Sequence, residues 1–295
     1  MQAPANSGGV KVFYSPKMVA DSGSFSPSAS KPEWVVQAWR EAGLPIELVE
    51  PGPVSREQLA LAHERAYVDG VLDGRLANGF GNRSQAVAAS LPFTSGAMLA
   101  AARAAIDGAR GNAPFAGVAA APCSGFHHAR HDGAAGFCTF NGLMVVACVL
   151  KQEGRAGRIG ILDFDEHYGD GTDEIVAWLG ADWVVHYSAG RHWRSPAHAE
   201  RFLAEVPAIV DTMAGCDLVL YQAGADPHVD DPLGGWLTTG QLRRRDRLVF
   251  EACRRLGLPV AWNLAGGYQE DRRRIVEIHV NTMRECVAVY RGSAG

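Results

Sequence analysis

Short apolar runs alternate with longer amphipathic stretches along most of this chain. Runs such as GVAAAP at 117–122 and DLVLYQAG at 217–224 are short and nearly continuous, which is typical of strands buried on both faces of a sheet. We expect strands over residues 10–14, 117–122, 158–165, 183–188, 217–224 and 258–267. Between them apolar residues recur about every three to four positions, which is the helical period. We therefore expect helices over residues 33–43, 55–72, 95–109, 139–154, 171–180, 198–213, 238–257 and 272–291.

The alternation of strands and helices predicts an α/β fold, with a mostly parallel multi-stranded sheet flanked by helices. No composition break or internal repeat divides the sequence, so we predict a single domain over 1–295, with residues 1–9 flexible. Residues 73–93 are rich in Gly, Ser and Asn and are expected to form a long loop. Long loops in compact domains are often binding loops.

Composition narrows the class of protein. The 295 residues are 47% hydrophobic and 20% charged, which is typical of a globular protein with a large core. A net charge of −4 gives no basic surplus for nucleic acid, and the arginines at 243–247 are expected to form a solvated helix face. No run reaches the ~18 apolar residues that a membrane span needs. The six cysteines form no CxxC pair, so we expect reduced thiols and a cytoplasmic protein.

Ionisable side chains follow several of the predicted strands directly. In a parallel sheet the carboxyl ends of the strands meet at one edge, where α/β proteins bind their ligands. The groups that follow strand ends are His127, His128, Asp163, Asp165, His167, Asp170, Ser188, Asp226, His228, Asp230, Asp231 and Tyr268. We expect most of them to converge on a single site.

Asp165, His167 and Asp226 are candidate metal ligands. Residues two apart in an extended segment point to the same side, so Asp165 and His167 can reach one ion. Asp226 directly follows an apolar strand and would supply a third ligand. Two carboxylates and one imidazole with an open position suit hydrolytic Zn²⁺, and they also suit Fe²⁺. The alternative is that the strand has simply ended and its acids cap the next helix.

His127 and His128 are candidate catalytic groups, because they lie in a Gly-flanked loop beside the carboxylates. Asp163 and Asp170 are free to orient the two rings, as carboxylates commonly do for catalytic histidines. Tyr268 follows two glycines and can direct its phenol towards an oxyanion. Packing without function is the alternative for each of these residues.

Taken together, these residues resemble the zinc-dependent histone deacetylase family, which includes acetylpolyamine amidohydrolases. The resemblance runs from about residue 122 to 269. It rests on five blocks in the family's order, namely GFHHA, GFCTFN, DFDEHYGDGT, QAGADPHVDDPLGG and LAGGYQ. It implies the arginase–deacetylase fold and a metal-dependent deacetylase that cleaves a linear amide.

The resemblance also implies roles for individual residues. Zinc ligands would be Asp165, His167 and Asp226. His128 would take a proton from the attacking water and return it to the leaving amine, next to His127. Asp163 and Asp170 would orient the two histidines, and Tyr268 would stabilise the oxyanion. A K⁺ or Na⁺ ion would lie beside Asp163, Asp165, His167 and Ser188.

The resemblance also implies parts of a substrate channel. Phe137, next to Gly136, would form one wall of the channel, and Leu233 would lie at the rim, where some polyamine-selective relatives carry Glu. The segment after Ser188 departs from the family pattern, with Trp193 a candidate for the second wall. Glu166 and Tyr168 replace residues that are not metal ligands in relatives, so we expect the catalytic activity to be retained.

Three functions remain open from the sequence. The protein would deacylate a small acetylated amine such as a polyamine, deacetylate a lysine side chain in a peptide, or bind metal and an acyl group without turnover. A homo-oligomer would allow a partner subunit to add acidic groups near the rim. Acyl-chain length and the native metal stay open as well.

Overall fold

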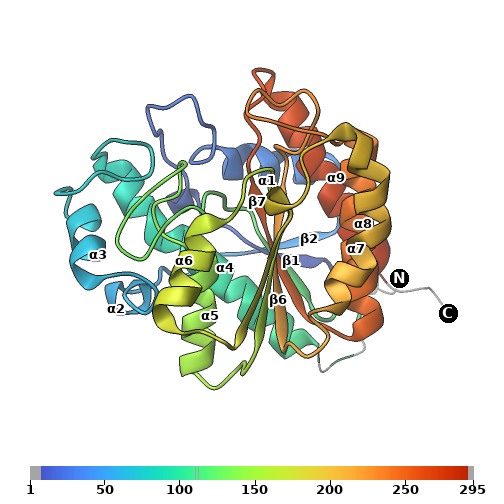
Figure 1. Ribbon diagram of the computed structural model, residues 1–295, viewed down its shortest axis with the longest axis horizontal. Coiled ribbons are helices and arrows are strands. Elements are labelled where there is room, and N and C mark those ends of the chain that lie inside the picture. The colour runs from blue at the N-terminus through green and yellow to red at the C-terminus, as the bar shows by residue number, and fades with distance from the viewer. Residues whose placement is uncertain (1–7, 110, 112, 292–295) are drawn as a thin grey trace, which may run out of the picture.

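The computed structural model describes residues 8–109, 111 and 113–291 (Figure 1). Its strands are β1 (Val10–Phe13), β2 (Ile46–Val49), β3 (Val118–Ala121), β4 (Ile159–Asp163), β5 (Val184–Ser188), β6 (Leu218–Gly224) and β7 (Val260–Ala265). Within the described residues they form one sheet in the order β2-β1-β3-β7-β6-β4-β5, and every pairing is parallel. The predicted α/β class with a mostly parallel sheet is confirmed.

Helices cover both faces of this sheet (Figure 1). They are α1 (Lys31–Glu41), α2 (Arg56–Leu59), α3 (Arg65–Leu72), α4 (Gln85–Gly108), α5 (Gly142–Gln152), α6 (Asp170–Leu179), α7 (Ala199–Asp211), α8 (Thr239–Leu256) and α9 (Arg272–Tyr290). Side chains of α1, α7, α8 and α9 build one hydrophobic core, and those of α2 to α6 build the other. Strands β3, β4, β6 and β7 are buried along their whole length, which explains their predominantly apolar sequences.

Strand β2 was not predicted from the sequence. It pairs in parallel with β1 at the edge of the sheet, and none of its residues is buried. An edge strand has one neighbour and little core contact, so its sequence lacks the continuous apolar run of a central strand.

The single helix expected over 55–72 is wrong, because α2 and α3 are separated at residues 60–64. His63 lies in this break and is buried, with Nδ1 2.8 Å from the carbonyl oxygen of Arg130. Its Nε2 accepts a hydrogen bond from the backbone N–H of Asn141 at 2.8 Å. These contacts with distant segments fix a non-helical conformation that the local pattern cannot reveal.

The prediction of a loop over 73–93 is also wrong for residues 85–93, which are helical. Helix α4 begins at Gln85, after Ser84, whose hydroxyl accepts a hydrogen bond from the N–H of Val87 at 3.4 Å. The helix contains Pro92, and Ser95, the first residue of the expected helix, is buried inside it. The Gly, Ser and Asn content of residues 73–93 placed the start of the helix too late, and the structure tolerates Pro92 inside the helix although proline normally breaks a helix interior.

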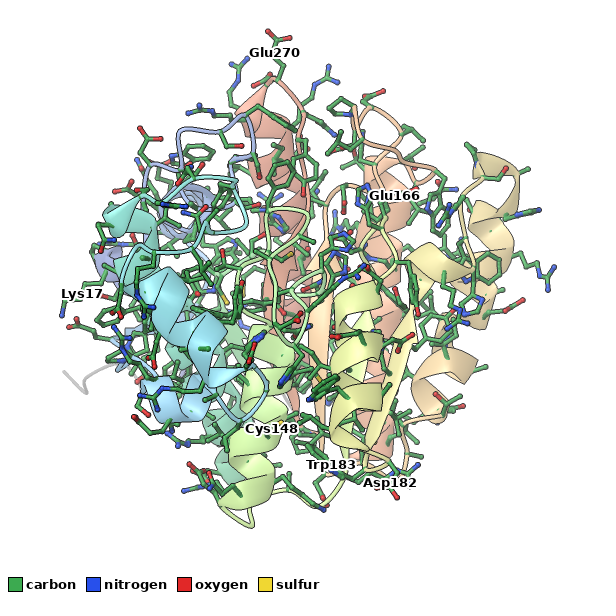
Figure 2. All side chains as sticks on the ribbon, turned by 60° about the vertical axis from the view of Figure 1, so that its left-hand side comes forward. Lys17, Cys148, Glu166, Asp182, Trp183 and Glu270 are labelled. Atoms are coloured by element: carbon green, nitrogen blue, oxygen red, sulfur yellow. The ribbon has the colours of Figure 1, made fainter. Side chains whose placement is uncertain are left out.

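The carboxyl ends of the strands lie at one edge of the molecule, as expected. In Figure 2, Glu166 and Glu270, which follow β4 and β7, lie towards the top of the view. Asp182 and Trp183, which precede β5, lie at the bottom. The ionisable groups that follow the strands are therefore gathered at the upper edge.

Other expectations concern the ends of the chain and its cysteines. Residues 1–7 of the N-terminal segment expected to be flexible lie outside the described residues, and Gly9 packs closely against Pro45. All six cysteines are buried and unpaired, which confirms free thiols. Within the described residues, we find no helix with the length and apolar character to span a bilayer.

The expectation of a solvated arginine face at 243–247 is wrong for Arg245. Its side chain is buried in α8 and pairs with Asp246, Nε lying 2.9 Å from Oδ1. Asp246 also accepts hydrogen bonds from the hydroxyls of Tyr221 on β6 and Thr282 on α9. Three elements are thus joined through one buried carboxylate.

Replacing Asp246 by alanine is expected to lower the free energy of unfolding by about 3–5 kcal/mol, because it leaves the Arg245 charge buried and unpaired. Urea unfolding of the purified variant measures this loss. Asp211→Ala is the control, since Asp211 pairs with Arg255 at the surface and should matter little. Equal stabilities of the two variants would contradict the role of the buried network.

Candidate metal centre

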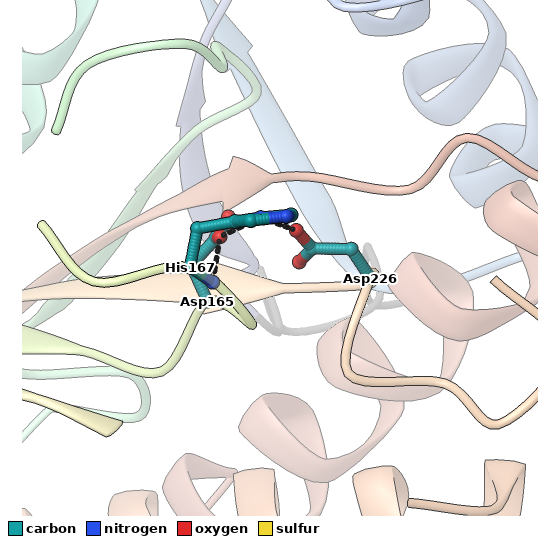
Figure 3. Close-up of side chains that lie close together, drawn as sticks. All are labelled: Asp165, His167 and Asp226. Carbon is teal, nitrogen blue, oxygen red and sulfur yellow. Dashed lines mark hydrogen bonds and ion pairs between the residues drawn. The ribbon is translucent and has the colours of Figure 1, made fainter. Parts of the chain in front are cut away.

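The structure brings Asp165, His167 and Asp226 together at the carboxyl ends of β4 and β6 (Figure 3). One potential ligand atom from each residue lies within 4.8 Å of the others. His167 Nδ1 lies 3.0 Å from Asp226 Oδ2 and 3.2 Å from Asp165 Oδ1. Gly266 leaves the space that the Asp226 carboxylate occupies, because a Cβ at this position would lie 2.0 Å from Asp226 Oδ1. Only glycine therefore fits beside that carboxylate.

Two carboxylates buried side by side are electrostatically unfavourable without a cation. Burial and the charge of Asp165 raise the pKa of Asp226 to about 8. Burial also opposes ionisation of Asp165, but the neighbouring His127 and His167 outweigh it and lower its pKa. Hydrogen bonds to Asp165 and Asp226 raise the pKa of His167 to about 11. The site thus attracts positive charge strongly, and its oxygen and nitrogen donors fit a divalent metal.

Two histidine–carboxylate pairs lie beside these residues. His127 Nδ1 is 2.8 Å from Asp163 Oδ2, and His128 Nδ1 is 2.7 Å from Asp170 Oδ1. The centroids of the two imidazole rings are 4.1 Å apart. Both rings are therefore held through Nδ1, and His127 Nε2 lies 3.6 Å from Asp165 Oδ1.

The two histidines differ in their affinity for a proton. Burial disfavours the charged form of His127, but the charges of Asp163 and Asp165 outweigh it and raise its pKa to about 9. Burial and the neighbouring His127 lower the pKa of His128. Without a metal ion, His127 is therefore the more readily protonated of the two histidines. This division suits an electrostatic role for His127 and general-base chemistry for His128.

Tyr268 is positioned by a turn that is held from both sides. Its backbone N–H donates to Asp231 Oδ2 at 2.8 Å, and Lys31 Nζ donates to the carbonyl oxygen of Gly266. Burial, together with the charges of Asp226 and Asp165, raises the pKa of the Tyr268 phenol well above its usual value. The phenol therefore stays protonated and can donate a hydrogen bond close to the two carboxylates.

Phe137 and Gly136 adopt positive φ angles of 63° and 52°. A Cβ on Gly136 would lie 2.4 Å from His128 Cδ2, so the backbone here packs directly on the histidine. A positive φ at a phenylalanine is strained, and strained backbone of this kind clusters at functional sites. The Phe137 ring lies 5.7 Å from the Tyr268 ring, centroid to centroid.

A shallow pocket of about 430 Å³ opens beside these groups. Its lining residues are His128, Glu166, His167, Tyr168, Asp170, Arg194 and Leu233. Leu233 is 40% exposed, at the rim. This pocket connects the candidate histidine base and a candidate ligand to the outside of the protein.

Trp193 does not supply a wall of the channel, contrary to the expectation from the sequence. Its side chain is buried in the core, where it stacks on Trp236 at 6.4 Å and packs against Phe202. Phe25, from the Ser-rich segment before α1, instead meets Phe137 edge to face at 5.2 Å. Phe25 is 70% exposed and also lies 6.2 Å from the Tyr268 ring.

Ser188 lies beside Asp163, with its hydroxyl 3.3 Å from Oδ2. The same hydroxyl accepts a hydrogen bond from the N–H of Gly169 at 3.0 Å. The residues expected around a monovalent cation are therefore neighbours. Gln222 also donates to Asp163 Oδ1 at 2.9 Å, which the sequence did not indicate.

The strand-end groups outside this cluster have other partners. His228 is buried with Nε2 2.9 Å from the hydroxyl of Thr239, and Asp230 pairs with Arg274 at 3.0 Å. Lys31 and Phe25 were missed, because both approach the site from segments distant in sequence. Their only local signals are a lysine at a helix start and a lone aromatic residue in a serine-rich stretch.

Comparison with known proteins identifies the family. Residues 27–195, more than half of the chain, match the family model described as histone deacetylase domain. An uncharacterized protein of Picosynechococcus sp. is 30% identical over 275 residues, covering 83% of this chain and 87% of that protein. This chain belongs to the histone deacetylase family.

Other members of the histone deacetylase family show more distant similarity. The rice protein "Histone deacetylase 10, chloroplastic" is 26% identical over 266 residues, which cover 76% of this chain but 59% of that protein. Two solved structures share the fold. The HDA15 HD domain has a TM-score of 0.76 at 18% identity, covering 97% of this chain and 92% of that one. An acetylpolyamine aminohydrolase from Burkholderia pseudomallei has a TM-score of 0.70 at 20% identity, covering 95% and 99%. The predicted arginase–deacetylase fold is therefore confirmed.

Proposed function

We propose that this deacetylase-family chain is a zinc-dependent amidohydrolase that removes an acetyl or short acyl group from an amine. The substrate would be a small acetylated amine or an acetyl-lysine side chain. The observation that carries the proposal is the convergence of Asp165, His167 and Asp226 beside two histidine–carboxylate pairs. Family membership supports amide deacetylation, and the donor set supports the metal.

Asp165, His167 and Asp226 would hold the metal. A zinc ion bound there would act as a Lewis acid on the amide carbonyl and would make an attacking water more acidic. Three protein ligands with an open position are the usual arrangement of catalytic zinc, although Fe²⁺ accepts the same donors. A K⁺ or Na⁺ ion beside Asp163 and Ser188 would offset the buried negative charge.

His128 is the proposed general base. Its Nδ1 faces Asp170, which leaves Nε2 free to take a proton from the attacking water, and its lowered pKa keeps it neutral at pH 7. The same nitrogen then returns the proton to the leaving amine. His127, held by Asp163, would stabilise negative charge that develops on the water and the carbonyl.

Tyr268 is the proposed hydrogen-bond donor to the developing oxyanion. Asp231 and Lys31 fix the turn that carries it, so the phenol needs little reorganisation during the reaction. Phe137, Gly136 and Phe25 are proposed to contact the acyl chain and the stem of the amine, with Leu233 at the rim.

Phe25→Ala is expected to raise KM for an acetyl-lysine amide by roughly 3- to 10-fold, because one aromatic contact contributes about 0.5–1.5 kcal/mol. The value of kcat should change little, since the ring is exposed and does not contact the candidate ligands. Trp178→Ala is the control, because Trp178 is 68% exposed on α6 and stacks on His131 instead. An unchanged KM in Phe25→Ala would remove Phe25 from the substrate channel.

A panel of substrates tests the proposed function. Metal-free protein is reconstituted with Zn²⁺ or Fe²⁺ and given an acetyl-lysine amide, an acetylated diamine and their longer-acyl analogues. We expect release of the acyl group from at least one of them only after metal addition. Metal binding without release from any of them would favour an acyl-binding protein that lacks turnover.

A further inference from the structure

Arg245 contacts both segments that carry the candidate metal ligands, although it lies behind them on α8. Its Nη1 donates to the carbonyl oxygen of Phe164 at 3.0 Å and to that of Gly224 at 2.8 Å. Phe164 immediately precedes Asp165, and Gly224 lies two residues before Asp226. The side chain of Arg245 is only 1% exposed.

The two carbonyl groups lie where the sheet stops joining the two strands. Pairing between β4 and β6 ends at Asp163 and Gln222. Beyond this point β4 and β6 no longer pair with each other, and buried carbonyl groups there need another donor. One guanidinium nitrogen of Arg245, Nη1, donates a hydrogen bond to each of the two carbonyl groups and so bridges the two segments.

We propose that Arg245 is a positioning residue that sets the separation and orientation of Asp165 and Asp226 for metal binding. This inference rests on the proposed function, because it assumes that these two carboxylates hold the metal. It assigns a role to a residue that touches neither the metal nor the substrate.

The position of the guanidinium is itself fixed. Asp246 Oδ1 lies 2.9 Å from Nε and 2.8 Å from Nη2 of Arg245. Tyr221 and Thr282 donate hydroxyl hydrogen bonds to the same carboxylate, from β6 and α9. Each strand end is therefore connected through Arg245 to a network in the hydrophobic core built by α1, α7, α8 and α9.

Gly224 shows how closely the two segments must approach. A Cβ at this position would lie 2.6 Å from the Cα of Asp165 and 3.0 Å from Asp226 Oδ1. Small shifts of either segment would therefore change the distance between the two carboxylates directly. A bidentate or bridging contact of this kind depends on the planar guanidinium, which lysine does not reproduce.

The test compares metal affinity in Arg245→Lys, Asp246→Asn and the wild type. Arg245→Lys keeps the positive charge but loses the planar guanidinium that contacts both carbonyl groups. Asp246→Asn removes the negative charge that pairs with Arg245. Zn²⁺ affinity is measured by competition with a chromophoric chelator, and site geometry by the visible absorption of the Co²⁺ form. Arg244→Lys is the matched control, because Arg244 lies on the same helix and pairs with Glu200 at the surface.

We expect both buried variants to bind Zn²⁺ about 10- to 100-fold more weakly, the range typical for residues that orient metal ligands. Their Co²⁺ spectra should differ from that of the wild type, while Arg244→Lys should match it in both measurements. Because a variant that is partly unfolded also loses affinity, the zinc-induced rise in Tm is recorded alongside as a measure of binding by the folded form.

Wild-type affinity and an unchanged Co²⁺ spectrum in Arg245→Lys would overturn the inference and leave the proposed function intact. A lower Tm with unchanged metal affinity would also overturn it, since Arg245 would then contribute only to stability. Absence of metal binding by the wild type would contradict the proposed function and the inference together.

Discussion

Replacing Tyr268 by phenylalanine is expected to lower kcat for an acetylated amine by about 10²- to 10³-fold, the usual cost of losing one oxyanion donor. The ring would still pack against Phe137, so substrate binding and the fold should persist. The loss should therefore appear in kcat, with KM and metal content close to those of the wild type. Initial rates over a range of substrate concentrations separate these quantities.

Tyr290→Phe is the matched control for this change. The Tyr290 hydroxyl is buried and has no hydrogen-bond partner in the part of the chain that the structure describes, and it lies on α9. Tyr290→Phe should leave kcat unaltered. A Tyr268→Phe enzyme that keeps the wild-type rate would show that another group stabilises the oxyanion.

The second large effect is expected from Asp226→Asn. Removing one of two anionic ligands should weaken zinc binding by more than about 100-fold, beyond the range seen for groups that only orient ligands. Activity should fall with the bound metal. The fold should persist, because the raised pKa of Asp226 shows that its charged form is unfavourable in the metal-free protein.

Asp230→Asn tests whether this effect is specific to the ligand. Asp230 lies in the same loop but pairs with Arg274 and is largely exposed, so its variant should bind one zinc per chain. Metal content after dialysis and activity are measured for both proteins. Full zinc content in Asp226→Asn would exclude Asp226 from the metal site.

The central strands and the cluster at their ends could be predicted because both follow from local sequence. Strand β4 is buried along its whole length, so its apolar run is unbroken and the acids after it are conspicuous. Parallel pairing then brings Asp165, His167 and Asp226 to one edge without any knowledge of side-chain contacts. The structure confirms this convergence, while the roles of the residues stay predictions.

Other features depend on contacts that local sequence does not encode. Lys31 reaches Gly266 across 235 positions of the chain, and Arg245 reaches Phe164 across 81. A charged residue in a helix is usually solvated, so the arginine-rich stretch of α8 gave no sign that one of its members is buried. Trp193 failed as a channel wall for a related reason, since its burial depends on Trp236 and Phe202 in other segments.

The most direct test of the account is a zinc titration of metal-free protein during hydrolysis of an acetyl-lysine amide, with released acetate measured directly. We expect no acetate without metal, a rate that rises in proportion to added zinc, and a plateau at one zinc per chain. A rate that does not depend on zinc, or a plateau that Asp226→Asn reaches at the same zinc concentration, would contradict the proposal that Asp165, His167 and Asp226 form the centre of a metal-dependent deacetylase.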